Sequence, residues 1–396
     1  MLKQLVIVDP HGIRCDLYET AEGLGLSPCI VTQNDHLGML PPDADVSICT
    51  ELTPENLMAL VQKRQVSGIW TPDPKYRSVV REIAEKMLFP HWAIPPYQSF
   101  LKTLKENPAV ADLIHPEHFV SSVEEAEKAV NTLGIPVYIQ SMQSGNYPKR
   151  MEVDNVSDVS LAFNKVKGSN DSSSVSVAKL PKSEVYWAPG FKIGREFKPI
   201  EIISVTLSNN MYRVPIRYLV PAELNGADYT NVVDVVRKVG LHLPHGVAAI
   251  TMELIYTDNG PRVMSIRSAY DFEPVLKKLL NRGYGLEIDH DLLRIFAGHP
   301  PESTPCWEMA SAAQWLQPSS GIVQSVQGID AAQSVKGIRE VGLSLEPGDT
   351  VSHIEDTEQR DRIGYILSQA ASTETVLGAI QIASGCIHIE TKPVLD

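Results

Sequence analysis

The chain has 396 residues, of which 43% are hydrophobic and 21% are charged, and its formal net charge at pH 7 is −13. This length exceeds one ordinary domain, and the composition is typical of a globular protein with two or three domains that each bury a core. The acidic balance and the absence of any Lys/Arg cluster argue against nucleic acid and anionic membrane surfaces as partners. We therefore expect a protein that acts on small molecules.

The cysteines and the first residues of the chain indicate a reducing compartment. The five cysteines are scattered and form no CxxC pair, so neither a disulfide framework nor a zinc site is expected. The short apolar run before Asp9 and Pro10 does not match a signal peptide, and no apolar stretch approaches transmembrane length. We expect a cytoplasmic protein without membrane association.

Strands and helices alternate in the first quarter of the chain. Short apolar runs predict buried strands, and the segments between them predict helices. The expected strands are Leu2 to Asp9, Cys29 to Thr32, Val46 to Cys49 and Gly68 to Thr71, and the expected helices are Cys15 to Leu24, Pro54 to Arg64 and Tyr76 to Met87. This alternation predicts a parallel sheet with right-handed crossovers.

A helix, a strand and a basic loop are predicted in the next part of the chain. Ser122 is a favourable N-cap, because its hydroxyl can accept a hydrogen bond from the first helical turn. This helix leads into the strand Ile135 to Gln140. A loop from Ser141 to Met151 follows and carries two cations, Lys149 and Arg150.

The stretch from Leu241 to Glu273 has the clearest pattern in the chain. Two runs rich in β-branched and apolar residues, Val247 to Thr257 and Pro261 to Ile266, flank the turn Asp258-Asn259-Gly260. Asn followed by Gly between two such runs tolerates the positive φ of a tight turn. The stretch therefore predicts a β-hairpin.

Helices and short strands complete the chain. Helices are expected before the hairpin, from Asn231 to Val239, and after it, from Glu273 to Gly283. From Ala312 onward, short β-rich runs with Gly and Pro turns precede a helix from Thr373 to Ser384 and a last strand. This pattern predicts a compact α+β domain at the C-terminus.

The predicted hairpin resembles the last core hairpin of the ATP-grasp ligases. In that family a Glu on the first strand, and a Glu and an Asn on the second, hold the magnesium ions that bridge the ATP phosphates. The first Glu matches Glu253. The family's second-strand pattern, E-[IV]-N-P-R, falls on Ser265-Ile266-Arg267-Ser268-Ala269. Ser265 thus replaces the second metal-binding Glu, Arg267 replaces the Asn, and Ala269 replaces the Arg that binds substrate.

Further resemblance to the ATP-grasp family lies on the phosphate side of the site. LGIPVYIQ, which ends at Gln140, is similar to the family's LGFPVVVKP, so Gln140 stands where a Lys neutralises ATP phosphate. An amide donates a hydrogen bond but supplies no charge. Another Lys of the family matches Lys102 best by spacing, with Lys105 as the second choice.

The loop from Ser141 to Met151 takes the place of the family's flap over the phosphates. Lys149 or Arg150 on this loop can supply the missing charge, because a basic side chain on a lid reaches a phosphate from another direction. The alternative is a surface loop with two solvated cations.

A family pattern also precedes the hairpin. GREF at Gly194 to Phe197 matches G-x-E-[FY], which implies that Glu196 lies in the ATP site, while the acidic hinge of the family falls on Ala188-Pro189-Gly190. Arg217 and Tyr218, on a following strand, are candidates to line a substrate pocket. The alternative for such an arginine is an ion pair at the sheet edge.

The C-terminal part resembles the corresponding domain of the ATP-grasp L-amino-acid ligases, the dipeptide synthetases. The resemblance extends from G-I-V at 321–323 through E-P-G-D at 346–349 to I-H-I-E-T at 387–391. It implies an ATP-grasp fold of mixed α/β and α+β class. The implied parts are an N-terminal parallel α/β domain at 1–98, a small lobe with the flap at 99–190, a core lobe at 191–305 and a ligase-type domain at 306–396.

The resemblance implies a ligase that uses ATP and Mg²⁺ to convert a carboxylate into an acyl phosphate, which an amine attacks to give an amide. Its substrates would be an amino acid or small carboxylate and an amine. Glu253 is the implied metal ligand, and Glu253 and Arg267 are the implied catalytic residues. The implied cofactor-binding residues are Lys102, Gln140, Lys149, Arg150, Glu196 and Ser265, and the implied substrate-binding residues are Arg217, Tyr218 and Arg267.

The second hypothesis is a catalytically degenerate ATP-grasp relative that binds a metabolite or a partner enzyme. The replacements at Gln140, Ser265 and Ala269 favour it, because magnesium is usually held through one or two carboxylates plus phosphates. Arg267 cannot ligate a cation. The intact architecture favours the ligase, and both hypotheses are compatible with a homodimer.

Overall fold

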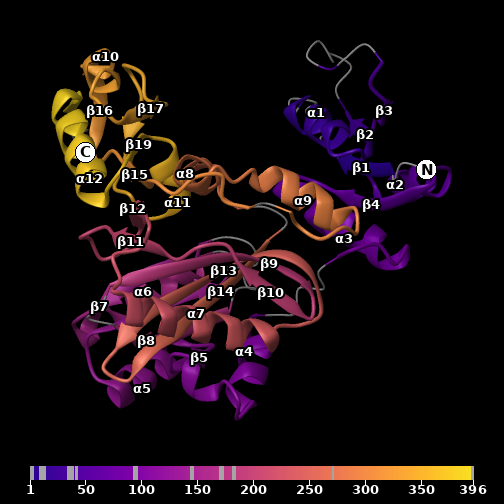
Figure 1. Cartoon of the computed structure of the whole chain (residues 1–396). Helices are drawn as coiled ribbons and strands as arrows, with labels where there is room; N and C mark the ends of the chain where they lie inside the picture. Colours follow the sequence, from indigo (N-terminus) through magenta and orange to yellow (C-terminus); the bar gives the residue numbers. More distant parts are fainter. Residues whose placement is uncertain are drawn as a thin grey trace.

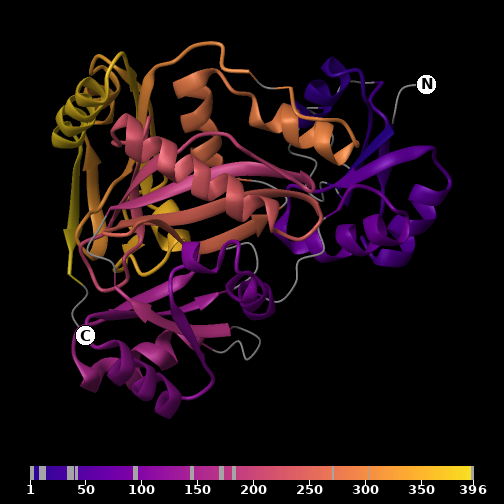
Figure 2. The ribbon, with the colours of Figure 1, turned by 60° about the horizontal axis from the view of Figure 1, so that its bottom comes forward.

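The computed structural model describes residues 4–8, 15–33, 40, 43–91, 97–142, 147–168, 174–180, 184–269, 272–302 and 304–393. Figures 1 and 2 show the N-terminal and C-terminal domains on opposite sides of the molecule, with the small lobe at the bottom of both views. The elements follow the predicted order, and the mixed α/β and α+β class is confirmed.

The N-terminal domain is built on a parallel sheet in the order β3-β2-β1-β4. Apolar side chains of these strands, such as Val6 and Ile69, are completely buried against the helices. The strands are β1 (Gln4–Val8), β2 (Ser27–Thr32), β3 (Val46–Ile48) and β4 (Val66–Trp70), and the helices are α1 (Cys15–Gly23), α2 (Pro54–Gln62), the 3-10 turn η1 (Pro74–Tyr76) and α3 (Arg77–Lys86). The predicted parallel sheet is confirmed.

The small lobe is an antiparallel sheet in the order β5-β8-β6-β7, with helices packed on one face. Its strands are β5 (Glu117–Val120), β6 (Val137–Met142), β7 (Lys149–Val153) and β8 (Ser174–Lys179), and its helical elements are α4 (Tyr97–Glu106), η2 (Ala111–Leu113), α5 (Val123–Leu133), η3 (Val156–Asp158) and α6 (Val159–Lys167). Ser122 caps α5 as predicted, since its side chain accepts a hydrogen bond from the backbone N–H of Glu125 at 3.3 Å.

The two faces of β6 have different environments. Val137 and Ile139 join the apolar core beneath α5 and α6, so the alternation of the strand places Tyr138 and Gln140 on the opposite face. The predicted loop from Ser141 to Met151 needs a correction. β6 continues to Met142 and pairs with β7, whose Arg150 lies opposite Gln140. Residues 143–146 of that loop lie outside the described residues.

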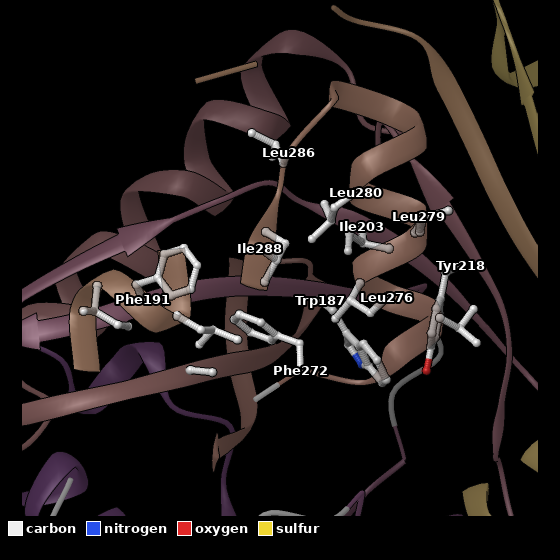
Figure 3. Close-up of a cluster of buried hydrophobic side chains, with 14 of the residues drawn as sticks. Trp187, Phe191, Ile203, Tyr218, Phe272, Leu276, Leu279, Leu280, Leu286 and Ile288 are labelled. Atoms are coloured by element: carbon white, nitrogen blue, oxygen red, sulfur yellow. The ribbon is translucent and has the colours of Figure 1, made fainter. Parts of the chain in front are cut away.

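A large antiparallel sheet runs from the hairpin into the C-terminal domain in the order β14-β13-β9-β11-β12-β15-β19-β17, with β10 paired to β9. Its strands are β9 (Val185–Gly194), β10 (Glu196–Pro199), β11 (Ile203–Leu207), β12 (Pro215–Val220), β13 (Gly246–Thr257), β14 (Gly260–Ala269), β15 (Ala310–Trp315), β17 (Ile338–Leu343) and β19 (Gly364–Ala370). Helices α7 (Gly226–Leu241), α8 (Pro274–Tyr284) and α9 (Ile288–Phe296) cover its core-lobe part. Leu276, Leu279 and Leu280 of α8 pack with Trp187 and Tyr218 (Figure 3).

The C-terminal domain also contains elements outside this sheet. A separate sheet in the order β18-β16-β20 stands beside it. The strands of this second sheet are β16 (Gly321–Gln327), β18 (Thr350–Val351) and β20 (His388–Lys392). The helices of the domain are α10 (Ile329–Gln333), α11 (Thr357–Asp361) and α12 (Thr373–Cys386). The predicted helix from Thr373 is confirmed and ends two residues later than expected.

The predicted hairpin is confirmed and sets the geometry of the candidate site. β13 and β14 pair antiparallel, with Glu253 opposite Ser265 and Thr251 opposite Arg267. Because side chains two residues apart share a face of a strand, Glu253, Ser265 and Arg267 lie on one face. Trp187 of β9 lies opposite Glu253 on its other side and shares that face.

Candidate functional site

Glu253 is completely buried, and its carboxylate is surrounded by donors from described residues. Arg150 donates from Nη1 to Oε1 at 3.1 Å and from Nη2 to Oε2 at 2.8 Å. Tyr147 donates its hydroxyl to Oε1 at 3.2 Å, and Ser265 donates to Oε2 at 2.8 Å. Each carboxylate oxygen thus accepts hydrogen bonds from two described side chains, which fill the directions that a bound cation needs.

The Arg150 guanidinium connects the small lobe to the core lobe. Its side chain is 2% exposed, and besides Glu253 it donates to Gln140 Oε1 from Nε at 3.2 Å and from Nη2 at 3.0 Å. It also lies over the ring of Tyr138, 4.8 Å from the centroid. Gln140 in turn donates to Glu117 Oε2 at 3.4 Å. A continuous polar chain therefore extends from Glu117 through Gln140 and Arg150 to Glu253.

A cavity of about 490 Å³ lies next to this series of hydrogen-bonded side chains, between the small lobe and the core lobe. Arg150 and Tyr138 form part of its wall, and Arg217 also lines it, with a side chain that has no hydrogen bond or ion pair to the described residues. The lining residues are Tyr138, Arg150, Leu180, Glu184, Val185, Ser204, Val205, Thr206, Leu207, Arg213, Arg217, Glu223 and Met264. A cavity of this size, with a mixed polar and apolar wall, fits a small molecule.

A second cluster of charges joins the hairpin to the C-terminal domain. Glu273, directly before α8, accepts hydrogen bonds from Tyr218 Oη at 2.8 Å and from Arg267 Nη1 at 3.3 Å. Arg360 of α11 approaches the same carboxylate with Nη2 at 3.4 Å. Arg360 is 1% exposed, and its guanidinium lies 3.8 Å from the ring centroid of Trp315. Glu273 therefore ties two buried arginines together.

Comparisons with known proteins agree with this geometry. The sequence family described as L-amino acid ligase C-terminal domain 2 matches residues 314–392. The crystal structure of an L-amino acid ligase from Bacillus licheniformis superposes with a TM-score of 0.74 at 16% identity, covering 98% of this chain and 99% of that chain. This chain has the ATP-grasp fold. Residues 314–392 within it resemble the C-terminal domain of the L-amino acid ligases.

Other ATP-grasp structures show the same fold. The N5-carboxyaminoimidazole synthase of Aspergillus clavatus, solved with ADP and 5-aminoimidazole ribonucleotide, gives a TM-score of 0.67 at 14% identity over 96% of this chain and 98% of that chain. A curated relative, "Uncharacterized protein y4rH" of Sinorhizobium fredii, is 26% identical over 179 residues. That match covers 44% of this chain and 36% of the relative's length, so this chain spans about a third of that protein.

The ATP-grasp residues predicted from the sequence fall into two groups. Hydrogen bonds link Gln140 to Arg150, Arg150 to Glu253 and Glu253 to Ser265, and Arg267 lies next to Ser265 on the same face of β14. Three others lie elsewhere. The side chain of Lys102 is 73% exposed and pairs with Glu106 at 3.7 Å, that of Lys149 is 56% exposed and pairs with Asp356 at 3.3 Å, and Glu196 is exposed at the start of β10.

Lys105, the second choice from the sequence, lies at the end of the polar chain instead. Its ammonium is 3.7 Å from Glu117 Oε1 and donates to the backbone carbonyl of Glu117 at 3.2 Å. The three hinge positions predicted at 188–190 lie inside β9, where Ala188 is completely buried. Glu184 and Val185, just before and at the start of β9, line the cavity instead. No motif in the sequence marks Glu184.

Arg217 and Tyr218 separate because neighbouring strand residues point to opposite faces. Arg217 lines the cavity, whereas Tyr218 is completely buried and donates to Glu273. No local motif marks Glu117, Tyr147 or Arg360 either, because each contacts a partner that is distant in the sequence.

The residues around Glu253 do not fit magnesium. Ser265 and Arg267 replace the ligands expected on β14, and Arg150 already holds both oxygens of Glu253. Within the described ranges, no three His, Cys, Asp or Glu side chains gather as a metal ion would require. The described part of the chain also contains no helix long and apolar enough to cross a membrane.

The ionisation of Glu253 follows from its partner. Burial alone raises the pKa of Glu253, but the charge and hydrogen bonds of Arg150, with the Ser265 bond, lower that pKa below its ordinary value. A carboxyl whose folded-state pKa is lowered stabilises the fold above its unfolded pKa, and this contribution is lost as pH falls through the folded pKa. The pair is therefore ionised at neutral pH.

Glu117 lies at the other end of the hydrogen-bonded series that begins at Glu253. Its contribution to the stability of the fold depends on pH in the opposite direction. Burial raises the pKa of Glu117, and Lys105 only partly offsets this effect. When the pKa of a carboxyl is raised in the folded state, the stability of the fold decreases as pH rises from the unfolded-state pKa through the folded-state pKa. Replacing Glu117 by Gln is therefore expected to increase the free energy of unfolding at neutral pH, by the order of 1 kcal/mol, and to give no increase in mild acid.

Urea denaturation at acidic and neutral pH measures this difference. The control is Glu127→Gln on the exposed face of α5, which is expected to change the free energy of unfolding equally at both pH values. A neutral-pH loss of stability in the Glu117→Gln variant would mean that the ionised Glu117–Lys105 pair stabilises the fold.

Proposed function

We propose that this chain is a catalytically degenerate ATP-grasp protein, which binds a small molecule between its lobes and does not activate a carboxylate with magnesium and ATP. The observation that supports this function is the buried pair of Arg150 and Glu253. The guanidinium of Arg150 takes the place of a cation beside the carboxylate that matches the family's metal ligand.

The energetics of the pair oppose metal entry. Magnesium must displace Arg150 from both oxygens of Glu253, and separating one partner of a buried ion pair costs about 3–5 kcal/mol. The displaced guanidinium and Arg267 would then repel the metal. Gln140 contributes no charge towards a triphosphate. Together these terms disfavour the binding of Mg–ATP at this site.

Two observations favour the ligase hypothesis. The cavity between the lobes is present, and the similarity to the L-amino acid ligase of Bacillus licheniformis extends over 98% of this chain. As a ligase, the protein would form an amide from an amino acid or small carboxylate and an amine. Arg150 would have to leave Glu253 whenever ATP binds. A cytoplasmic location and a homodimer remain predictions.

Calorimetry and product assays on the full chain separate the two functions. ATP is titrated with magnesium and with EDTA, and ADP release is measured with single amino acids and with pairs. We expect no ADP release above the protein-free rate, and any affinity for ATP to be the same with and without magnesium. ADP release that needs both magnesium and an amino acid, and that disappears in Glu253→Gln, would establish the ligase instead.

A further inference from the structure

Arg267 has a hydrogen-bonding edge that no described residue uses. Its side chain is 9% exposed, and Nη1 donates to Glu273 at 3.3 Å. Nε and Nη2 are buried, and neither has a hydrogen-bond partner among the described residues. In a guanidinium group these two N–H bonds point in the same direction, so they form the fork that accepts two oxygens of one planar anion.

Aromatic rings hold this fork in place. The Arg267 guanidinium lies 4.2 Å from the ring centroid of Trp187 and 5.4 Å from that of Tyr147. The indole Nε1 of Trp187 is a further buried donor without a partner among the described residues. Buried donors without acceptors are costly, and here they come from two side chains in contact. Both groups can only donate, so the ligand that satisfies them must be an acceptor.

The charges around Arg267 restrict the kind of acceptor. The cations Arg267 and Arg360 face the carboxylates Glu273 and Asp361, and Arg360 Nη2 is 2.7 Å from Asp361 Oδ1. This cluster is already balanced, so a ligand brings uncompensated negative charge into a largely buried place. A carboxylate brings one charge, whereas phosphate near neutral pH brings up to two. A carboxylate is therefore the less costly ligand.

We propose that Arg267 and Trp187 bind the carboxylate of a small ligand, with the Nε–Nη2 fork of Arg267 as its main contact. This proposal rests on the proposed function and specifies its ligand. The charges at the hairpin are then the reverse of those in the ATP-grasp pattern, in which acidic and amide side chains bind cations. Arg150 replaces the cation at Glu253, and an anion binds at Arg267, where the family's sequence pattern has a metal-binding Asn.

Anion titrations of the full chain test the proposal without nucleotide. Acetate and inorganic phosphate are added at constant ionic strength, with chloride as the balancing anion, while tryptophan fluorescence and the unfolding midpoint are recorded. Acetate is expected to give a saturable change in both signals and to bind more tightly than phosphate. Tighter binding of phosphate, or no saturation with either anion, overturns the proposal.

Matched arginine variants locate the site. Arg267→Lys keeps the charge but removes the fork, and it is expected to weaken acetate binding roughly tenfold or more, the factor for one lost charge-assisted hydrogen bond. Arg262→Lys on the same strand is the control, and its affinity should equal that of the parent. Equal affinities of all three proteins for acetate would overturn the proposal.

A second variant covers the case in which Arg267→Lys fails to fold. Trp187→Phe keeps an aromatic ring under Arg267 but removes the indole donor, so it is expected to weaken acetate binding and to abolish the fluorescence change. Retention of the full fluorescence change would contradict the proposed place of the anion. These assays contain no ATP or magnesium. Magnesium-dependent turnover would refute the proposed function but would not change the acetate result. A lack of acetate binding would refute the anion site but would not change the result of the turnover assay.

Discussion

Replacement of Arg150 by Met is expected to lower the free energy of unfolding by about 3–5 kcal/mol, the range for removing one partner of a buried ion pair. Methionine retains an unbranched apolar chain but leaves the carboxylate of Glu253 without a cation, at a position that is completely buried. Gln140 Oε1 also loses both donors from the guanidinium. Chemical denaturation measures the loss.

The pH dependence distinguishes this mechanism from a simple packing defect. In the parent, Arg150 holds the pKa of Glu253 below its ordinary value, so the contribution of the pair is lost as pH falls. In Arg150→Met burial dominates, the pKa of Glu253 rises, and stability is instead lost as pH rises through that value. The difference in stability between parent and variant should therefore shrink in acid. A difference that is independent of pH would contradict an ionised pair.

Two further variants complete the test. Lys149→Met changes the neighbouring residue of β7, whose side chain is 56% exposed, and should cost less than about 1 kcal/mol. The double variant Arg150→Met with Glu253→Met removes both charges, and a buried ion pair replaced by apolar groups is often neutral. It should recover most of the lost stability. If it is no more stable than Arg150→Met alone, the two side chains are not coupled.

Regular patterns in the sequence were sufficient for the framework of the site. The turn Asp258-Asn259-Gly260 and the β-branched and apolar runs beside it predicted the hairpin. The helix cap at Ser122 is equally local. Such features depend on neighbouring residues alone, and therefore the sequence contains them in full. A simple register from that turn would pair Glu253 with Met264, and a bulge next to Glu253 places it opposite Ser265 instead.

The contacts that close the site are not local. Arg150 was assigned to a lid loop, yet β7 pairs with β6 and aims its guanidinium across the lobes at Glu253, 103 positions along the chain. GREF matched a family pattern in its letters, but it belongs to the short β9–β10 hairpin, and this places Glu196 in solvent. A motif transfers a function only when the strand that carries it also has the same neighbours.

Replacement of Arg360 by Met is the second change with a large expected effect, again about 3–5 kcal/mol of unfolding free energy. Arg360 donates from Nη1 to the carbonyl of Pro215 at 2.9 Å and to Tyr218 Oη at 3.0 Å, and it pairs with Glu273. Burial alone raises the pKa of Glu273, and the charges of Arg360 and Arg267 lower it below its ordinary value. Without Arg360, Glu273 keeps one cation, and the carbonyl of Pro215 loses this buried donor.

Arg360 belongs to the C-terminal domain, and Glu273 precedes α8 of the core lobe. The Arg360→Met change should therefore also weaken the attachment of the C-terminal domain to the core lobe. Limited proteolysis is expected to cut the variant faster than the parent between β15 and α12, while denaturation reports the total loss. Arg362→Met is the control, because the side chain of Arg362 is 74% exposed and its ion pair is with Glu358, an equally exposed residue of α11. Equal stability of the two variants would mean that Arg360 is no more important than a surface arginine. A large loss confined to Arg360→Met would instead show that the buried cluster at Glu273 couples the ligase-type domain to the strand that carries Arg267.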